Sequence, residues 1–498
     1  MSAVAAERIP VIIGAGEIND RPEIATEGLD SLGLMAAALQ AAERDAGGGW
    51  LAVLDSLHIV NQISWPVDDI VQALPQRLGI APAYVVTGGP SGDSPVRYLN
   101  DAANRIAAGQ SQVAAIAGGE GLRTAAARAR AGQGAAPSKE LMRERAEAAA
   151  SPLRLKYGLL TPTDIYPLYE NATRAAWGMS LEAAQAESAQ IWSLFAETAA
   201  ANPQAWIRER HSAERIALPS PDNRPIAHPY SKLMVANSAV NQGAALIVTS
   251  LAKARAAGIA EDRLVYLWAG AGAKEPDNFL ERDRYDHSPS MAVVLEQALA
   301  RNGLTTGDLD CAELYSCFPC VPKMARRIIG WPADRPASVI GGLTFAGGPI
   351  GNYMSHAAAG MVTRLRQGRR FGLLYGNGGY VTKNHALILS REAPPAAVLA
   401  QDYDVQALAD ARRGAIPALL ELYVGPGEIE TYTVLYDRDG AARFGAIIGR
   451  TPKGTRFLAR VPKEDTAMIG FLVSGEAEPV GAKGQAVRGE AGLAEWQG

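Results

Sequence analysis

Apolar and polar positions follow a pattern that occurs twice along the chain. An apolar run ending in a glycine turn occupies residues 10–16 (Pro-Val-Ile-Ile-Gly-Ala-Gly), and residues 265–272 (Val-Tyr-Leu-Trp-Ala-Gly-Ala-Gly) repeat it. A stretch with helical spacing follows each run, at 33–45 and at 289–302. Strand-length apolar runs alternating with helical patterns indicate strands covered by helices.

Further matched segments keep the same order, and the offset between the two copies changes by only a few residues. In the first and second half respectively they are strands at 55–62 and 310–317, helices that end at 108 and 366, and strands at 112–119 and 371–379. This repetition predicts two similar α/β halves with parallel or mixed sheets, packed about a pseudo-twofold axis.

Two regions lie outside the repeat. The segment 120–230 contains helical stretches such as 180–200, leads into a helix-like run at 232–240, and is expected to cover a site. Beyond residue 391 the pattern changes to short strands, predicted at 430–436, 444–449, 456–461 and 468–473. Strands of that length separated by turn residues favour a small antiparallel β-barrel. The last dozen residues are expected to be loose.

Composition sets further bounds. The 498 residues are 48% apolar and 20% charged, which at roughly 150 residues per domain permits about three domains. A net charge of −4 gives no electrostatic footprint for nucleic acid or for an anionic membrane. The three cysteines indicate no disulfide framework, and no signal peptide or membrane span is evident. We therefore expect a cytoplasmic protein.

Glycine-rich loops are the strongest chemical feature of the sequence. In both halves such a loop enters a helix, at 88–94 (Gly-Gly-Pro-Ser-Gly-Asp-Ser) and at 347–353 (Gly-Gly-Pro-Ile-Gly-Asn-Tyr). Free backbone N–H groups at a helix start favour an anion or a polarised carbonyl oxygen. Related by a dyad, the two loops would face one site, together with a third glycine loop at 376–379.

Other motifs are weak. The Gly-Ala-Gly of residues 14–16 lacks the third glycine of a dinucleotide site, since Asn19 stands there. Cys317 and Cys320 form a single Cys-x-x-Cys, which is too few ligands for a structural zinc. No cofactor is therefore expected beyond a substrate.

Over residues 8–391 the chain resembles the thiolase superfamily, and within it the sterol-carrier-type thiolases. Four segments carry the resemblance. Two of them lie in the first half: residues 113–120, which contain Ala-Gly-Gly, and residues 236–245, where Gln242 replaces the family's Asp. The other two lie in the second half: residues 313–318 (Glu-Leu-Tyr-Ser-Cys-Phe) and residues 341–351. It implies a duplicated five-layer αβαβα fold with an inserted loop domain over an acyl-CoA site. The implied domains are 1–264 with the loop domain at about 120–230, 265–393, a linker at 394–416, an OB-like barrel at 417–485 and a loose tail at 486–498.

The departures from the family pattern concern its reactive residues. In the resemblance, the nucleophilic cysteine falls at Gly92, the histidine of Gly-His-Pro at Gly348, and the second cysteine at Tyr375 or Gly376. Covalent acyl transfer requires a thiolate and a base, so thiolysis by that route is predicted to be absent. The backbone N–H groups of the loops remain, and these suffice to polarise a carbonyl.

The resemblance also supplies the site residues. The candidate catalytic residues are Tyr315, Ser316, Tyr353, His356 and Ser94. The candidate substrate-binding residues are Gly92, Cys317, Gly347, Gly348, Gly351, Gly376, Asn377 and Gly378.

The resemblance therefore implies an acetyl-CoA acetyltransferase-like protein of lipid metabolism that binds an acyl-CoA or a similar thioester. One alternative is a cysteine-independent retro-aldolase acting on a 3-hydroxyacyl-CoA, a carbon–carbon lyase. Another is a catalytically silent acyl-CoA-binding protein whose C-terminal barrel recruits a protein partner. Neither nucleic acid nor a membrane is expected as a partner.

Overall fold

The computed structural model describes residues 5–65, 67–133, 152–395, 402–489 and 492–498. Nine strands form one continuous sheet in the order β3-β2-β4-β7-β1-β8-β11-β10-β9. The first half contributes β1 (Pro10–Asn19), β2 (Ser56–Val60), β3 (Tyr84–Thr87), β4 (Val113–Gly121) and β7 (Asn241–Ser250). The second half contributes β8 (Val265–Lys274), β9 (Cys311–Glu313), β10 (Phe371–Gly378) and β11 (Lys383–Ser390).

The predicted duplication is confirmed by this strand order. The halves join where β1 pairs with β8, at Val11 with Tyr266 and Ile12 with Val265. Outward from this junction the order is β7, β4, β2 on one side and β11, β10, β9 on the other. The segments matched in sequence therefore occupy equivalent positions in the two halves.

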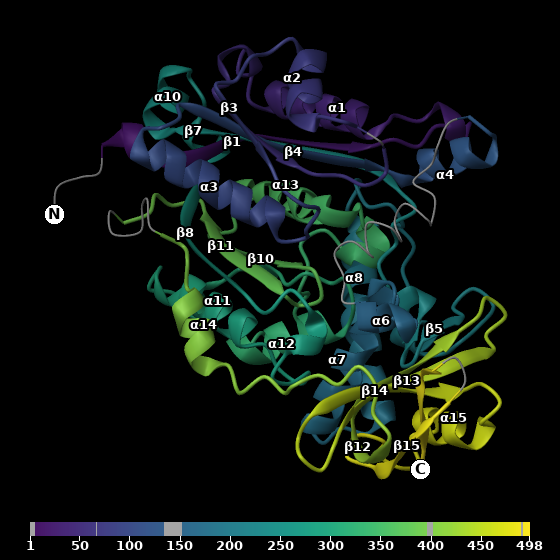
Figure 1. Ribbon diagram of the computed structural model, residues 1–498. Helices are drawn as coiled ribbons and strands as arrows, with labels where there is room; N and C mark the ends of the chain where they lie inside the picture. The colour runs from purple at the N-terminus through teal and green to yellow at the C-terminus, as the bar shows by residue number, and fades with distance from the viewer. Residues whose placement is uncertain (1–4, 66, 134–151, 396–401, 490–491) are drawn as a thin grey trace.

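Helices cover and separate the two halves of the sheet in five layers (Figure 1). The central layer is α3 (Ser94–Ala108) and α13 (Tyr353–Arg366). The outer layers are α1 (Ser31–Asp45), α2 (Ile70–Leu78) and α10 (Leu251–Ala256) on the first half, and α11 (Pro289–Ala300) and α12 (Cys320–Ile329) on the second. The glycines of residues 14–16 serve this packing, since a Cβ on Gly14 or Gly16 would overlap the backbone of α1.

The segment between the repeats is largely helical. It comprises α4 (Leu122–Arg130), α6 (Pro152–Lys156), α7 (Pro162–Ala176), α8 (Leu181–Ala201), α9 (Ala213–Ala217), β5 (Pro225–Ala227) and β6 (Tyr230–Ser231). The helix predicted at 232–240 is wrong, because only a 3₁₀ turn forms at Lys232–Met234. The remainder forms hydrogen bonds to the second half. Asn237 N–H donates to Leu343 O at 3.1 Å, and Asn237 O accepts from Gly348 N–H at 2.8 Å.

The C-terminal region contains a closed five-stranded barrel. Its elements are α14 (Gln406–Arg412), β12 (Gly425–Tyr436), β13 (Ala442–Arg450), β14 (Arg456–Pro462), α15 (Thr466–Val473), β15 (Lys483–Arg488) and β16 (Ala494–Gln497). The barrel closes through β12-β13-β14-β16-β15 and back to β12. The pairing of β14 with β16 is parallel and the others are antiparallel, so the predicted all-antiparallel arrangement is wrong at that pairing.

Three other predictions for this region differ from the structure. Residues 468–473 lie in helix α15, which Asp465 caps by accepting a hydrogen bond from Met468 N–H at 3.0 Å. The expected loose tail contains β16, whose Trp496 is 1% exposed in the barrel core. Within residues 394–416, expected to be a linker, α14 forms and Asp404 bridges to Gly272.

The barrel is fixed to the rest of the chain. The buried Arg456 guanidinium donates to the carbonyls of Leu280 and Arg282, both at 2.6 Å, and pairs with Glu430. Strand β12 also pairs with β5 through Leu435 and Ala227. Over the described part of the chain, every helix is too short or too polar to cross a lipid bilayer.

Candidate functional site

The three glycine loops converge between the two halves. A Cβ on Gly351 would lie 3.2 Å from Ser91 N and 3.2 Å from Ser91 O, so the second-half loop packs on the first-half loop. A Cβ on Gly376 would lie 3.0 Å from Asp93 Cα, and one on Gly378 would overlap the side chains of Ser91 and Asp93. The spacing of the repeat therefore brings these predicted glycines to one place.

Tyr315 fills the space beside Gly92. A Cβ on Gly92 would overlap the Tyr315 hydroxyl oxygen and the Asn377 carbonyl oxygen. The Tyr315 side chain is held in this position by a left-handed backbone, with φ of 51°, and by an edge-on contact with the Tyr353 ring at 6.0 Å. Tyr315 and Gly92 thus pack as a complementary pair of large and small residues.

The Tyr315 hydroxyl is protonated at neutral pH. Burial raises its pKa well above the ordinary value, and the nearby Cys317 and Asp93 raise it further. Only 6% of the residue is exposed. Tyr315 is therefore a hydrogen-bond donor rather than a base.

A buried acid that the sequence prediction did not include lies behind Tyr353. Glu313, at the end of β9, accepts hydrogen bonds from Ser338 Oγ at 2.7 Å, Val339 N–H at 3.1 Å and Tyr353 Oη at 3.0 Å. Burial raises the pKa of Glu313 to about 7. Its position at the end of a predicted buried strand was the signal available in the sequence.

Ser316 and Cys317 hold the site together from within. Ser316 Oγ accepts a hydrogen bond from Leu343 N–H at 3.0 Å, which ties the segment after β9 to the 341–351 loop. Burial raises the pKa of Cys317 to about 12, so this thiol is not ionised at neutral pH. Ser316 therefore positions the loop.

Asn377 contributes its backbone to the Gly92 contact and its side chain to the loop domain. Its Oδ1 accepts from Tyr166 Oη at 3.0 Å, and its Nδ2 donates to Asn384 Oδ1 at 3.2 Å. Tyr166 belongs to α7, and it also stacks on Phe318 with ring centroids 4.4 Å apart. The inserted segment thus packs directly on the third glycine loop.

The second-half loop presents different surroundings. Gly347 has a φ of 110° and is covered by the Gln242 side chain, which a Cβ on residue 347 would overlap. Around Gly348 the nearest atoms to a Cβ would be Asn237 O, Leu343 O and Ala236 Cβ, at 3.2, 3.3 and 3.4 Å. The Gly348 side is therefore less filled than the Gly92 side.

Two other predicted catalytic residues, His356 and Ser94, contact first-half residues. His356 Nδ1 lies 2.9 Å from Glu17 Oε1 of β1, on the first-half sheet. Within the described part of the chain, His356 Nε2 is buried with no hydrogen-bond partner. Ser94 begins α3, and its N–H donates to Ser91 O at 3.2 Å.

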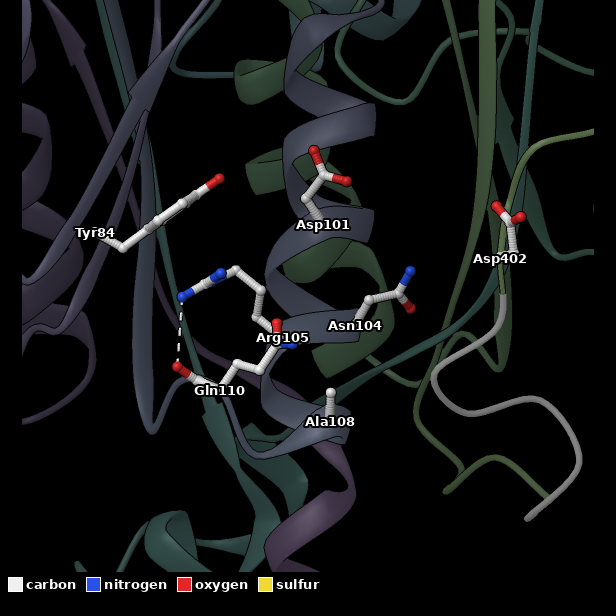
Figure 2. A pocket seen from close by; sticks show the side chains of 7 residues that line it. All are labelled: Tyr84, Asp101, Asn104, Arg105, Ala108, Gln110 and Asp402. Atoms are coloured by element: carbon white, nitrogen blue, oxygen red, sulfur yellow. Dashed lines mark hydrogen bonds between the residues drawn. The ribbon is translucent and has the colours of Figure 1, made fainter.

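Two cavities open elsewhere on the surface. One of about 360 Å³ lies along α3 between Tyr84, Arg105 and Asp402 (Figure 2). Another, of about 440 Å³, lies between α7 and the barrel. Their lining residues include none of the predicted site residues. Within the described ranges no cluster of three or more His, Cys, Asp or Glu side chains could hold a metal ion.

Comparisons with known proteins agree with this architecture. Residues 404–490 match the family described as the thiolase-like protein type 1 additional C-terminal domain. Human mitochondrial 3-ketoacyl-CoA thiolase shares the fold at 13% identity and a TM-score of 0.57, covering 78% of this chain and 100% of its own. A structure of an Ltp2-ChsH2(DUF35) aldolase shares it at 20% identity and a TM-score of 0.58, covering 78% and 99%. The search of curated proteins gives no match.

A further match extends over the whole chain. The crystal structure of a monomeric SCP2-thiolase like protein type 1 from Mycobacterium smegmatis is 31% identical, with a TM-score of 0.82, and 100% of each chain is covered. The match includes both thiolase-like halves, the inserted segment and the added C-terminal region. This chain therefore belongs to the family of type 1 SCP2-thiolase-like proteins.

Proposed function

We propose that this chain binds a CoA thioester between its two halves and holds it without forming an acyl-enzyme. The observation that carries the proposal is the packing of Tyr315 on Gly92. By the resemblance to thiolases, the nucleophilic cysteine falls at residue 92, and here the Tyr315 hydroxyl lies where a side chain of residue 92 would be. A glycine supplies neither a nucleophile nor a base, so the covalent route is absent.

The remaining groups are suited to polarising a carbonyl. Tyr315 offers a neutral hydroxyl, and the loops before α3 and α13 offer backbone N–H groups at helix starts. Donors of this kind stabilise the negative charge that develops on a thioester oxygen. The fold shared with a human mitochondrial 3-ketoacyl-CoA thiolase solved in complex with CoA supports CoA as the carrier.

Thermal unfolding with a panel of acyl-CoA thioesters tests the proposal. A ligand that binds only the folded chain raises the melting temperature with its concentration. We expect such a rise with at least one thioester, and an unchanged mass of the denatured chain afterwards. A melting temperature that no acyl-CoA shifts would contradict the proposal.

Retro-aldol cleavage of a 3-hydroxyacyl-CoA is the second candidate. The observation favouring it is that the carboxylate of Asp93 and the Tyr315 hydroxyl lie at the same end of α3. The carboxylate would take the proton of the 3-hydroxyl group, and the Cα–Cβ bond would break. The electron pair of that bond would form an enolate, whose negative oxygen would accept a hydrogen bond from the Tyr315 hydroxyl. Return of the proton to Cα would leave a shortened acyl-CoA and a free aldehyde or ketone.

Released carbonyl product separates this candidate from silent binding. If the chain is a lyase, incubation with a 3-hydroxyacyl-CoA should release an aldehyde or ketone. The Asp93→Asn variant, which lacks the carboxylate base, should release none. Binding without release would instead support a silent acyl-CoA-binding protein, whose barrel would then be tested for a protein partner by cross-linking.

A further inference from the structure

One buried carboxyl group holds both ends of the segment 339–353, which contains the second-half glycine loop. Glu313 Oε2 accepts hydrogen bonds from Ser338 Oγ at 2.7 Å and from Val339 N–H at 3.1 Å, where the chain enters this segment. Glu313 Oε1 accepts from Tyr353 Oη at 3.0 Å, where the segment ends and α13 begins. Glu313 is 0% exposed, so these hydrogen bonds are shielded from solvent.

Ser338 connects this carboxyl group to the backbone of the segment. Its Oγ accepts hydrogen bonds from three consecutive N–H groups, those of Ile340 at 3.3 Å, Gly341 at 2.9 Å and Gly342 at 2.9 Å. Gly341 and Gly342, with φ of 110° and 74°, turn the backbone around this oxygen. A hydroxyl has a single proton to donate, and here that proton is directed to Glu313.

The hydrogen bonds continue from this turn to the glycines of the loop. Leu343 N–H, the next along the chain, donates to Ser316 Oγ at 3.0 Å. Leu343 O accepts from Asn237 N–H at 3.1 Å, and Asn237 O in turn accepts from Gly348 N–H at 2.8 Å. The backbone at Gly348 is therefore fixed relative to the turn that the buried carboxyl group holds.

We propose that Glu313 is a positioning residue, which acts through Ser338 and Tyr353 to align the N–H groups of the second-half loop with the carbonyl oxygen of the bound thioester. The inference rests on the proposed function, in which those N–H groups polarise that carbonyl. Without the Glu313 carboxyl group, the Ser338 hydroxyl, the Val339 N–H and the Tyr353 hydroxyl would be buried donors without acceptors. The loop would then shift to satisfy them, and its hydrogen bond to the ligand would weaken.

Isothermal titration with two matched ligands tests this role. Acetyl-CoA presents a thioester carbonyl, whereas S-ethyl-CoA has the same chain length without the carbonyl oxygen. The ratio of the two affinities therefore reports the hydrogen bond to that oxygen. The disrupting variants are Ser338→Ala and Glu313→Leu. Glu313→Gln is the conservative variant, because its amide oxygen still accepts from Ser338 and Val339 while its NH₂ group donates to the Tyr353 oxygen.

The control is Ser390→Ala, which removes another buried hydroxyl. Ser390 is 0% exposed, and its Oγ donates to Arg370 O at 2.9 Å. It pairs with Phe371 at the start of β10, whereas the third glycine loop lies at the other end of that strand. Its loss should therefore destabilise the chain without moving the loops.

The native chain should bind acetyl-CoA at least about fivefold more tightly than S-ethyl-CoA, from one hydrogen bond to the carbonyl oxygen. In Ser338→Ala and Glu313→Leu this ratio should fall below about twofold, with the affinity for S-ethyl-CoA unchanged. Glu313→Gln and the control should keep the native ratio.

A native ratio in Ser338→Ala would overturn the positioning role and leave the proposed function standing. This variant decides the question by itself if Glu313→Leu does not fold. A ratio that falls equally in Ser390→Ala would also overturn the role, because loss of stability alone would then explain the change. A native chain that binds neither ligand, or binds both equally, would overturn the positioning role and the proposed function together.

Discussion

Gly92 and Gly348 stand in the two glycine loops that precede α3 and α13, yet their surroundings differ. At Gly92 the space for a side chain is occupied by the Tyr315 hydroxyl and the Asn377 carbonyl. At Gly348 the nearest atom to a Cβ would be 3.2 Å away, and the backbone is not in the left-handed region. The first position is closely packed around its glycine, whereas the second leaves nearly enough room for a Cβ.

This difference indicates which change is harder to reverse. A side chain restored at residue 92 would need the removal of a buried tyrosine and a shift of backbone. A side chain restored at residue 348 would need adjustments of only a few tenths of an ångström. On the proposed function, the Tyr315–Gly92 contact is the feature that would distinguish this site from a nucleophilic one.

The largest expected effect comes from Gly92→Ala. The added methyl would overlap both Tyr315 and the Asn377 backbone, and overpacking of this kind should cost about 3 kcal/mol of unfolding free energy. Urea denaturation measures the loss.

Tyr315→Asn supplies the matched background for Gly92→Ala. Asparagine is smaller and tolerates the left-handed backbone of residue 315. In that background Gly92→Ala should cost at least about 1 kcal/mol less. If Gly92→Ala costs the same unfolding free energy in both chains, Tyr315 does not fill the space beside Gly92, and the proposed difference between Gly92 and Gly348 is wrong.

The next effect concerns the buried Glu313 that bonds to Tyr353 behind the second loop. The pKa of Glu313 rises from an ordinary 4.5 to about 7 on folding, so the folded chain holds a proton that the unfolded chain releases. Its contribution to stability is complete below about pH 4.5 and is lost as the pH rises through 7.

The Glu313→Gln variant separates the contribution of Glu313 from the pH dependence of the other groups. The native chain should lose roughly 3 kcal/mol more than Glu313→Gln between pH 4.5 and 7.5, because glutamine cannot ionise. Urea denaturation at a series of pH values measures the difference. Parallel pH profiles for the two chains would show that folding does not raise the pKa of Glu313.

Gly348→Ala should be a smaller change. Contacts of 3.2 to 3.4 Å require only slight movement of the neighbours, so the expected cost is below about 1 kcal/mol. The same denaturation assay applies. A cost equal to that of Gly92→Ala would remove the distinction between the two loops.

Tyr315→Phe should change stability least. The ring and its packing remain, so the unfolding free energy should stay within about 0.5 kcal/mol of the native value. The thermal shift caused by an acyl-CoA should nevertheless decrease, because the donor to the thioester oxygen is lost. A thermal shift equal to the native one would place the ligand away from Tyr315.

The sequence was sufficient to predict the duplicated fold, and physical reasons account for the exceptions. The apolar runs that become β1 and β8 are long and buried, so their pattern survives packing. The run at 468–473 is apolar throughout, and without alternation it is ambiguous between strand and helix. The segment 232–240 departs from its helical pattern because its hydrogen bonds go to the 341–351 loop.

The sequence was sufficient to predict which backbone loops form the site, but not which side chains contact one another there. Glycine spacing located the loops that meet at Ser91 and Gly351. The chain alone did not reveal that Tyr315 would fill the space at Gly92, because that contact joins segments from different halves. Nor did it separate His356 from Tyr353, since α13 is buried between two halves of the sheet and helical periodicity does not say which half each residue contacts.

Native mass spectrometry with an acyl-CoA tests the central proposal most directly. The account predicts a one-to-one complex that retains the whole thioester under native conditions and leaves the chain at its original mass on denaturation. An acyl group that stays on the denatured chain, or a native spectrum without any complex, would contradict it.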